Sequence, residues 1–134
     1  MENKKNSEPF EFDKAIDPES IANLYDNDYN WIEEVFSSVL AEYSSGYAKI
    51  EQTLGEKDIA GLRKAVHKIK PAFGFVGMLQ MQEMCKNLEE KCQDIASITA
   101  LENETSILLN NLTTCREILE KEYDRLKIFN QNQV

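Results

Sequence analysis

Apolar residues recur at intervals of three and four through most of this chain, and that spacing limits its fold more than any other feature. One such run contains Ile32, Val35, Phe36, Val39, Leu40, Tyr43, Tyr47, Ile50 and Leu54. This spacing places the apolar side chains along one side of an α-helix. Similar stripes follow within residues 59–76, 78–95 and 101–126, whereas no segment shows the sustained apolar and polar alternation of a strand. The sequence therefore predicts an all-α protein.

Local signals predict where the helices begin and end. Asp17 followed by Pro18 is typical of a helix start, because aspartate caps free N–H groups and proline fits the first helical position. That start would open a short helix carrying Ile21, Leu24 and Tyr25. Asp58 is a plausible cap for the helix that follows Gly55, and a break is expected at residues 96–97. Four long amphipathic helices with short connections predict an antiparallel up-down four-helix bundle with a short extra N-terminal helix, and the Met and aromatic stripes are then core.

A chain of 134 residues is long enough for one ordinary domain. We expect a flexible N-terminal lead-in at residues 1–13, the bundle at 14–128 and a polar C-terminal tail at 129–134. Hydrophobic residues make up 42% and charged residues 29%, which is typical of a soluble globular protein. The chain has no apolar run near the ~20 residues of a membrane span, and its start is polar, so we expect a cytoplasmic protein.

Three cysteines, Cys85, Cys92 and Cys115, make an odd number and lack the C-x-x-C spacing of zinc or redox sites. Cys85 and Cys92 lie seven residues apart on one apolar stripe. Buried, reduced thiols are therefore favoured over a disulfide.

The charge distribution singles out one short region. The net charge of −9 argues against nucleic acid and anionic membranes as partners, since both are bound largely through cationic side chains. Within Gly61–Lys70, however, there are four Lys or Arg residues and no acid, together with the only histidine of the chain, His67. At about 100° per residue, His67 lies roughly 120° from the centre of its helix's apolar stripe, so it should face water.

This setting suits phosphoryl chemistry. An imidazole with an ordinary pKa of about 6.5 is largely neutral at neutral pH and can attack phosphorus as a nucleophile. Arg63, Lys68 and Lys70 lie within about one turn of His67 and would stabilise the added negative charge. Gly74 and Gly77 would give a partner's active site room to approach.

Other interpretations of His67 are weaker. A surface histidine with no task is the usual case, but the basic surroundings argue against it here. A catalytic triad lacks its nucleophile and orienting acid, and an enzyme using His67 as general base has little support. One histidine without a cysteine cluster makes no convincing zinc site, and the E-x-x-H pairing of a carboxylate-bridged metal bundle is absent. We therefore expect no metal and no cofactor in this chain.

The stretch His67-Lys68-Ile69-Lys70, with Gly77 ten positions after the histidine, closely resembles the signature of histidine-containing phosphotransfer (HPt) domains, H-x-[LI]-K-G-x-x-x-x-x-[GA]. The resemblance extends from about residue 16 to 124. Further residues fall where such domains place similar ones: Ile16, Asp17, Asp28, Asp58, Leu79, Cys85, Leu88 and Glu89.

The resemblance implies a phosphorelay intermediate rather than an autonomous enzyme. His67 would accept a phosphoryl group from a phospho-aspartate on a response-regulator receiver domain, or on the receiver of a hybrid histidine kinase, and pass it to another receiver. The receiver would supply the Mg²⁺. Lys70 matches the lysine that helps to hold the phosphoryl group, and Glu89 matches an acid or amide that orients the imidazole. As an alternative, Glu89 is only an exposed carboxylate of the bundle. We expect a monomer.

The sequence departs from the signature at Pro71, where the family normally has glycine. Its missing N–H removes the hydrogen bond to the His67 carbonyl, and its ring costs about 3 kcal/mol in an ideal helix, so we predict a kink. A bend would expose His67 further, whereas the ring would obstruct a docking receiver. The second outcome leaves a rival function, a helical adaptor that binds receivers or kinases without phosphotransfer.

A docking surface is expected next to His67, built from apolar and small side chains ringed by basic ones. Phe75 has a second interpretation, which is packing against a neighbouring helix. The candidate docking residues are Lys64, Ala72, Phe75 and Met78.

Overall fold

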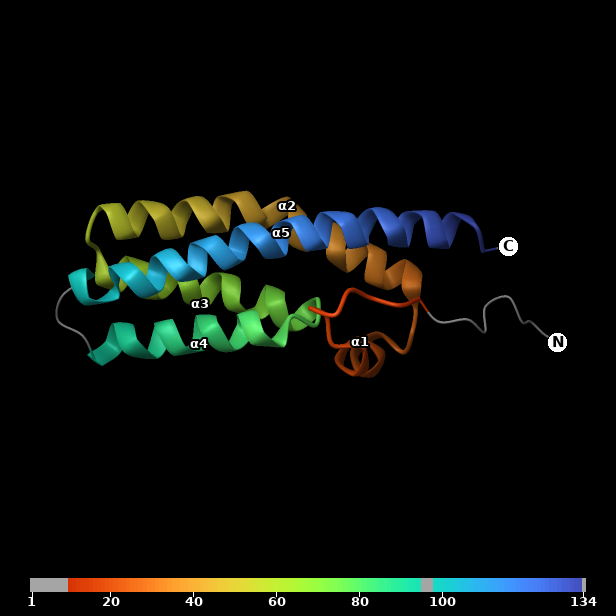
Figure 1. Ribbon diagram of the computed structural model, residues 1–134, viewed down its shortest axis with the longest axis horizontal. Coiled ribbons are helices and arrows are strands. Elements are labelled where there is room, and N and C mark those ends of the chain that lie inside the picture. The colour runs from red at the N-terminus through yellow and green to blue at the C-terminus, as the bar shows by residue number, and fades with distance from the viewer. Residues whose placement is uncertain (1–9, 95–97, 134) are drawn as a thin grey trace.

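The computed structural model describes residues 10–94 and 98–133, and these form a long helical bundle (Figure 1). The described residues contain no strand, and none of their helices is both long and apolar enough to cross a membrane. The all-α prediction is confirmed, while the expected break at 96–97 lies outside the described residues. The elements are α1 (Pro18–Tyr25), α2 (Tyr29–Gly55), α3 (Ile59–Phe75), α4 (Leu79–Asp94), the short 3₁₀ helix η2 (Ile98–Leu101) and α5 (Glu102–Gln131).

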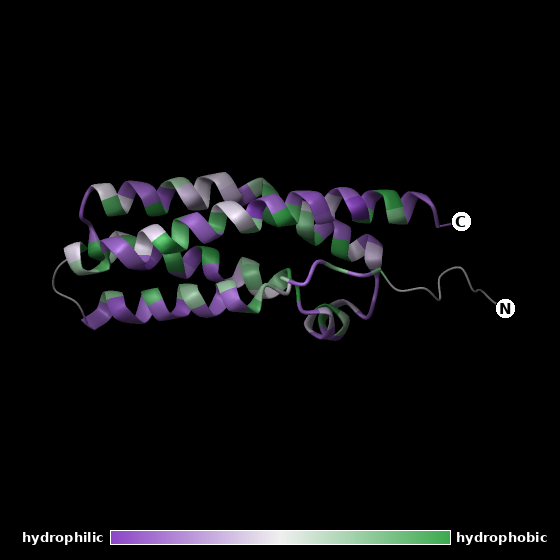
Figure 2. Cartoon of the chain, in the orientation of Figure 1, coloured by the Kyte–Doolittle hydropathy of each residue, from purple (hydrophilic) through white to green (hydrophobic). Residues whose placement is uncertain are grey.

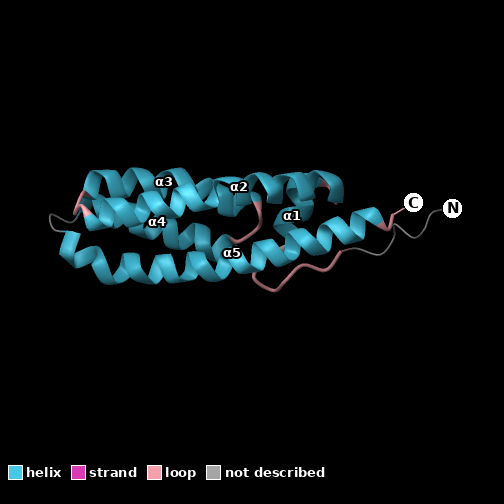
Figure 3. Cartoon of the chain, turned by 90° about the horizontal axis from the view of Figure 1, so that it is seen from above, coloured by secondary structure: helices cyan, strands magenta, loops and turns pink. Residues whose placement is uncertain are grey.

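The four long helices form the predicted antiparallel bundle. Helix α2 packs against α3 and α5, and α4 packs against the same two helices from the other side. Helices α2 and α5, with 27 and 30 residues, are much longer than α3 and α4, with 17 and 16. Their extra length projects past α3 and α4 at the end of the bundle where α1 and the C-terminus lie (Figures 1 and 3).

Aspartates start three of the helices. Asp17 accepts a hydrogen bond from the backbone N–H of Glu19 at 3.1 Å, and Asp58 accepts one from that of Gly61 at 2.9 Å, so both predicted caps are confirmed. Asp28 caps α2 in the same way, by accepting a hydrogen bond from the backbone N–H of Trp31 at 3.1 Å. A side-chain cap of this kind is typically worth about 1 kcal/mol. The caps therefore define where α1, α2 and α3 begin.

The apolar stripes of the long helices face one another, while purple hydrophilic residues cover the outside (Figure 2). Among the buried polar groups, the hydroxyl of Tyr43 donates a hydrogen bond of 2.5 Å to the carbonyl of Leu112, which links α2 to α5. All three cysteines are free and buried, as predicted. Burial raises the pKa of Cys85 to about 12, so this thiol stays protonated at neutral pH.

The N-terminal lead-in is shorter than predicted. Residues 1–9 lie outside the described part of the chain, but Phe10 is only 8% exposed. Its ring lies 5.4 Å from that of Phe129, and the guanidinium of Arg125 lies 4.5 Å above it. The prediction of a flexible lead-in is thus wrong for residues 10–13, because an aromatic side chain gains more from packing on the end of α5 than from solvation.

The C-terminal tail also differs from the prediction. Helix α5 continues to Gln131, so a polar tail from residue 129 is wrong for its first three residues. Phe129 packs against Tyr29 with ring centroids 5.2 Å apart, and the amide of Asn130 donates hydrogen bonds to the carbonyl of Tyr29 and to Glu33. These contacts with the start of α2 hold the last residues of α5 in the helix, although they lie beyond its regular apolar stripe.

Candidate functional site

The imidazole of His67 lies on the outer surface of α3, with 66% of its side chain exposed. Its helix turns Leu62, Val66 and Ile69 into the core, and all three are buried. Since His67 lies away from that stripe, the same periodicity that buries its neighbours directs its ring to solvent. The orientation expected from the sequence is therefore the one observed.

Glu89 of α4 contacts both His67 and Lys70. Its Oε2 lies 2.6 Å from Nδ1 of His67, and its Oε1 accepts a hydrogen bond of 2.8 Å from Nζ of Lys70. The carboxylate is shielded, with 12% of its side chain exposed, and the Lys70 side chain is 25% exposed. A single carboxylate thus connects the imidazole to its nearest lysine across the α3–α4 interface, and the alternative of an exposed bundle carboxylate is wrong.

The charge of Glu89 determines which ring nitrogen is free. Burial by itself raises the pKa of Glu89, but hydrogen bonds from Lys70 and His67, with the charge of Lys70, lower it overall. The group is therefore ionised at neutral pH, and an ionised carboxylate only accepts hydrogen bonds. Nδ1 of His67 must then carry the proton, which leaves the lone pair on Nε2.

The basic residues around His67 divide between two sides of α3. Lys70 faces α4 through Glu89, and Arg63 lies near Cys92 of α4, where it opposes the rise that burial causes in the pKa of that thiol. Lys64 and Lys68 are exposed and lie on the side of α2. The exposed ring is therefore flanked by positive charge on both sides.

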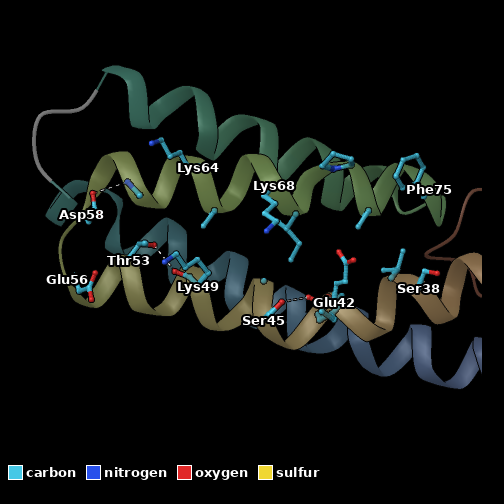
Figure 4. A pocket seen from close by; sticks show the side chains of 18 residues that line it. Ser38, Glu42, Ser45, Lys49, Thr53, Glu56, Asp58, Lys64, Lys68 and Phe75 are labelled. Atoms are coloured by element: carbon cyan, nitrogen blue, oxygen red, sulfur yellow. Dashed lines mark hydrogen bonds between the residues drawn. The ribbon is translucent and has the colours of Figure 1, made fainter.

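A groove of about 910 Å³ runs between α2 and α3, and its lining includes Lys64 and Lys68, which lie within one turn of His67 (Figure 4). In Figure 4, Lys64, Lys68 and Phe75 lie on the α3 wall and Glu42 and Lys49 on the α2 wall. The α2 wall was not predicted from the sequence. The small residues Ser44-Ser45-Gly46 within an otherwise amphipathic helix were the available signal.

Gly46 allows the two walls to approach each other. A Cβ at this position would lie only 2.9 Å from Cδ1 of Ile69 on α3. Any side chain here would therefore force the helices apart or displace Ile69.

The end of α3 presents part of the predicted docking surface. Phe75 is 52% exposed, which contradicts its packed alternative, and its carbonyl accepts a hydrogen bond of 2.7 Å from the hydroxyl of Tyr25. Ala72 and the exposed Pro71 line the same groove. Helix α3 continues through Pro71 to Phe75, so the proline does not end the helix, and the kink stays a prediction.

Two predicted site residues serve the fold instead. Met78 is 1% exposed, so its predicted place in a docking surface is wrong, because the residue precedes α4 with its side chain in the core. Gly77 is buried with φ of 73°, and a Cβ there would lie 3.1 Å from both Ile16 and Ile21. Gly77 lets the turn between α3 and α4 pass beneath the start of α1, so its predicted role in access to His67 is also wrong.

Gly74 lies on the same side of α3 as His67, but seven residues, or about two turns, further along the helix. A Cβ here would lie 2.7 Å from the amide nitrogen of Gln82 on α4. The position is partly exposed, so the absence of a side chain leaves the helix surface low about two turns beyond the ring.

The sequence profile of the family described as Hpt domain matches residues 34–127, which include His67, Lys70 and Glu89. The chain belongs to the Hpt domain family. Hpt domains are in general phosphocarriers of two-component signalling rather than enzymes, and they act with receiver domains and kinases.

The fold of this Hpt domain is also that of a solved relative. The crystal structure of the HPT domain from the Hpt sensor hybrid histidine kinase of Shewanella matches with a TM-score of 0.74 and 21% sequence identity, over 83% of this chain and 95% of that one. At this identity the likeness shows the fold alone. No curated protein matches the chain.

Proposed function

We propose that this Hpt domain is a phosphorelay intermediate that accepts a phosphoryl group on His67 from a receiver domain and passes it to another receiver. The observation that supports this most strongly is the contact between Nδ1 of the exposed His67 ring and the ionised Glu89. It presents Nε2 as the nucleophile and holds the ring in one orientation.

In the forward step, the lone pair of Nε2 attacks the phosphorus of a phospho-aspartate on the receiver. The N–P bond forms as the O–P bond breaks, and the aspartate carboxylate leaves with its electron pair. Lys70, Arg63 and Lys68 supply positive charge near the transferred group, and the Mg²⁺ is expected on the receiver. The reverse step, onto a second receiver, completes the relay without turnover by this protein alone.

The receiver is proposed to dock over the groove between α2 and α3, whose lining residues Lys64 and Lys68 lie within one turn of His67. Phe75 and Ala72 supply apolar contact there, and Lys64 supplies positive charge at the rim. A monomer is sufficient for this arrangement, because His67, Glu89 and the groove belong to one chain.

We propose the cytoplasm as the compartment. The three free cysteines are buried as thiols. Such a set is typical of proteins kept in reducing surroundings.

The relay is tested by incubating the protein with a phosphorylated receiver domain and looking for an acid-labile, base-stable phosphoryl label. Because the chain has one histidine, a phosphohistidine label identifies its own position. We expect label on the wild type and none on His67→Gln. Receiver binding without label would reject the relay and favour the adaptor, a function that Pro71 at the groove would explain by obstructing close approach.

Docking at the groove is tested with a pair of matched variants. Phe75→Ala removes an apolar side chain that is 52% exposed, and Ile107→Ala removes one that is 47% exposed on α5. We expect only Phe75→Ala to weaken receiver binding, by roughly tenfold, the loss typical of one interface anchor. Equal effects of the two variants would argue against this docking surface.

A further inference from the structure

Glu89 links two groups that take part in the proposed phosphotransfer. One of its oxygens contacts Nδ1 of His67 at 2.6 Å, and the other contacts Nζ of Lys70 at 2.8 Å. The carboxylate is shielded from solvent, whereas the ring is largely exposed. A charge in direct contact on the shielded side acts on the ring more strongly than charges separated from it by water. Of the charged groups around the ring, Glu89 should therefore have the largest effect on whether Nδ1 is protonated.

Release of a phosphoryl group from His67 depends on that proton. An acceptor oxygen, from a receiver's aspartate or from water, forms a bond to phosphorus while the Nε2–P bond breaks and its electron pair stays on Nε2. If Nδ1 is protonated, the ring leaves as neutral imidazole. If Nδ1 has lost its proton, the same step must expel an imidazolate anion, which is a far poorer leaving group.

We propose that the Glu89–Lys70 pair sets how readily phospho-His67 gives up its phosphoryl group. The carboxylate of Glu89 retains the proton on Nδ1, and Lys70 moderates this effect because it shares the same carboxylate. The proposal rests on the proposed function, since it concerns the phosphorylated ring. Glu89 is a positioning residue that acts through the imidazole. Its negative charge, which an amide would lack, favours rapid transfer of the phosphoryl group to an acceptor rather than its retention on His67.

Other charged groups near this part of α3 belong to three helices. On α2, Glu42 and Lys49 line the groove between α2 and α3, and both are exposed. On α4, the charged neighbours of Glu89 within one turn are Lys86, Glu90 and Lys91, and all three are exposed. On α3, Lys64 and Lys68 are exposed, whereas Arg63 and Lys70 are half-buried. Exposed charges are screened by water and salt, so their effect on the Nδ1 proton is expected to be smaller than that of Glu89.

The test uses phosphoramidate, a small phosphoryl donor that needs no receiver, to phosphorylate His67. Phosphorus NMR then follows loss of the phosphoryl group to water as a function of pH, which gives a titration midpoint for Nδ1. Glu89→Gln keeps a hydrogen-bond acceptor but removes the charge. We expect its midpoint to fall by about one pH unit, with phosphoryl loss roughly tenfold slower on the alkaline side. Lys70→Met should raise the midpoint, because it removes the cation that competes for Glu89.

Glu90→Gln is the matched control, because it makes the same charge change at the next residue of α4, on an exposed side chain. Its midpoint should stay within about 0.2 units of the wild type. The proposal is overturned if Glu89→Gln and Glu90→Gln shift the midpoint equally, if Lys70→Met moves it in the same direction as Glu89→Gln, or if phosphoramidate fails to modify His67.

Two further measurements keep the outcomes distinct. Thermal melting checks that each variant folds, and should Glu89→Gln fail to fold, the direction of the Lys70→Met shift decides alone. Failure of a phosphorylated receiver to label His67 would count against the relay function, while the midpoints from phosphoramidate would still be measurable.

Discussion

Replacing Gly77 by alanine should destabilise the fold, because the backbone at this turn has φ of 73°. An L-residue in this left-handed region costs about 1–2 kcal/mol. The added Cβ would also lie 3.1 Å from the side chains of Ile16 and Ile21 and 3.2 Å from the carbonyl of Asp17. Crowding of this kind adds about 1–2 kcal/mol, so the free energy of unfolding should fall by about 3 kcal/mol in total.

Gly74→Ala is the matched control, since Gly74 lies inside α3 with ordinary helical geometry. Alanine gains up to about 1 kcal/mol of helix propensity over glycine. The added Cβ would displace only the amide end of Gln82, a flexible side chain. We therefore expect the stability of Gly74→Ala to stay close to that of the wild type, or to rise slightly.

Urea unfolding followed by circular dichroism measures both variants. A loss of about 3 kcal/mol in a domain of this size corresponds to a fall of roughly 10 °C in Tm. The reasoning is refuted if Gly77→Ala unfolds within about 0.5 kcal/mol of the wild type, which is the range of an ordinary surface change. Receiver labelling adds a second readout, because only Gly74→Ala places a methyl group on the side of α3 that carries His67, and it should slow label transfer.

Three further predictions concern the core. Phe10→Ala should lower the free energy of unfolding, measured by urea titration, by about 2–3 kcal/mol. This is less than the cost of removing a phenylalanine from the centre of the core, because Phe10 lies at the end of the bundle. An unchanged free energy of unfolding would mean that the segment around Phe10 is not packed. Tyr43→Phe should cost about 1 kcal/mol by the same assay, through the lost hydrogen bond to Leu112, and a neutral result would contradict that bond. Burial raises the pKa of Cys85 from 9.0 to about 12, so its thiol stabilises the fold below about pH 9 and this contribution is lost as pH rises toward about 12. The free energy of unfolding, measured as a function of pH, should therefore fall less steeply between about pH 9 and 12 for Cys85→Ala than for the wild type. Parallel curves for the two proteins would contradict the prediction.

Comparison of the two ends of the chain shows where a periodic pattern stops being informative. Residues 10–13 and 129–131 carry too few apolar residues to form a stripe, so they were predicted to be flexible or polar. Phe10 and Phe129 are nevertheless packed together, more than a hundred residues apart in the chain. A contact of this separation leaves no local signal, because neither side chain has its partner within a helical turn.

The sequence alone was enough to predict the helices, their caps at Asp17 and Asp58, and the outward direction of His67. These features depend on interactions within about one turn of the chain, and a helical period reports them directly. It also showed that basic residues surround the histidine, because the charge of each residue and its distance along the helix are read directly from the sequence.

The family resemblance indicates that Glu89 orients the imidazole, but how the residues of the site meet depends on the packing of the helices. The pairing of Glu89 with His67 and Lys70 depends on how α4 is rotated and shifted along α3, and it joins residues 22 and 19 positions apart. The groove between α2 and α3 likewise depends on the close approach of the two helices at Gly46. Rotation and register between helices arise from packing of the whole core, so no short stretch of sequence specifies them.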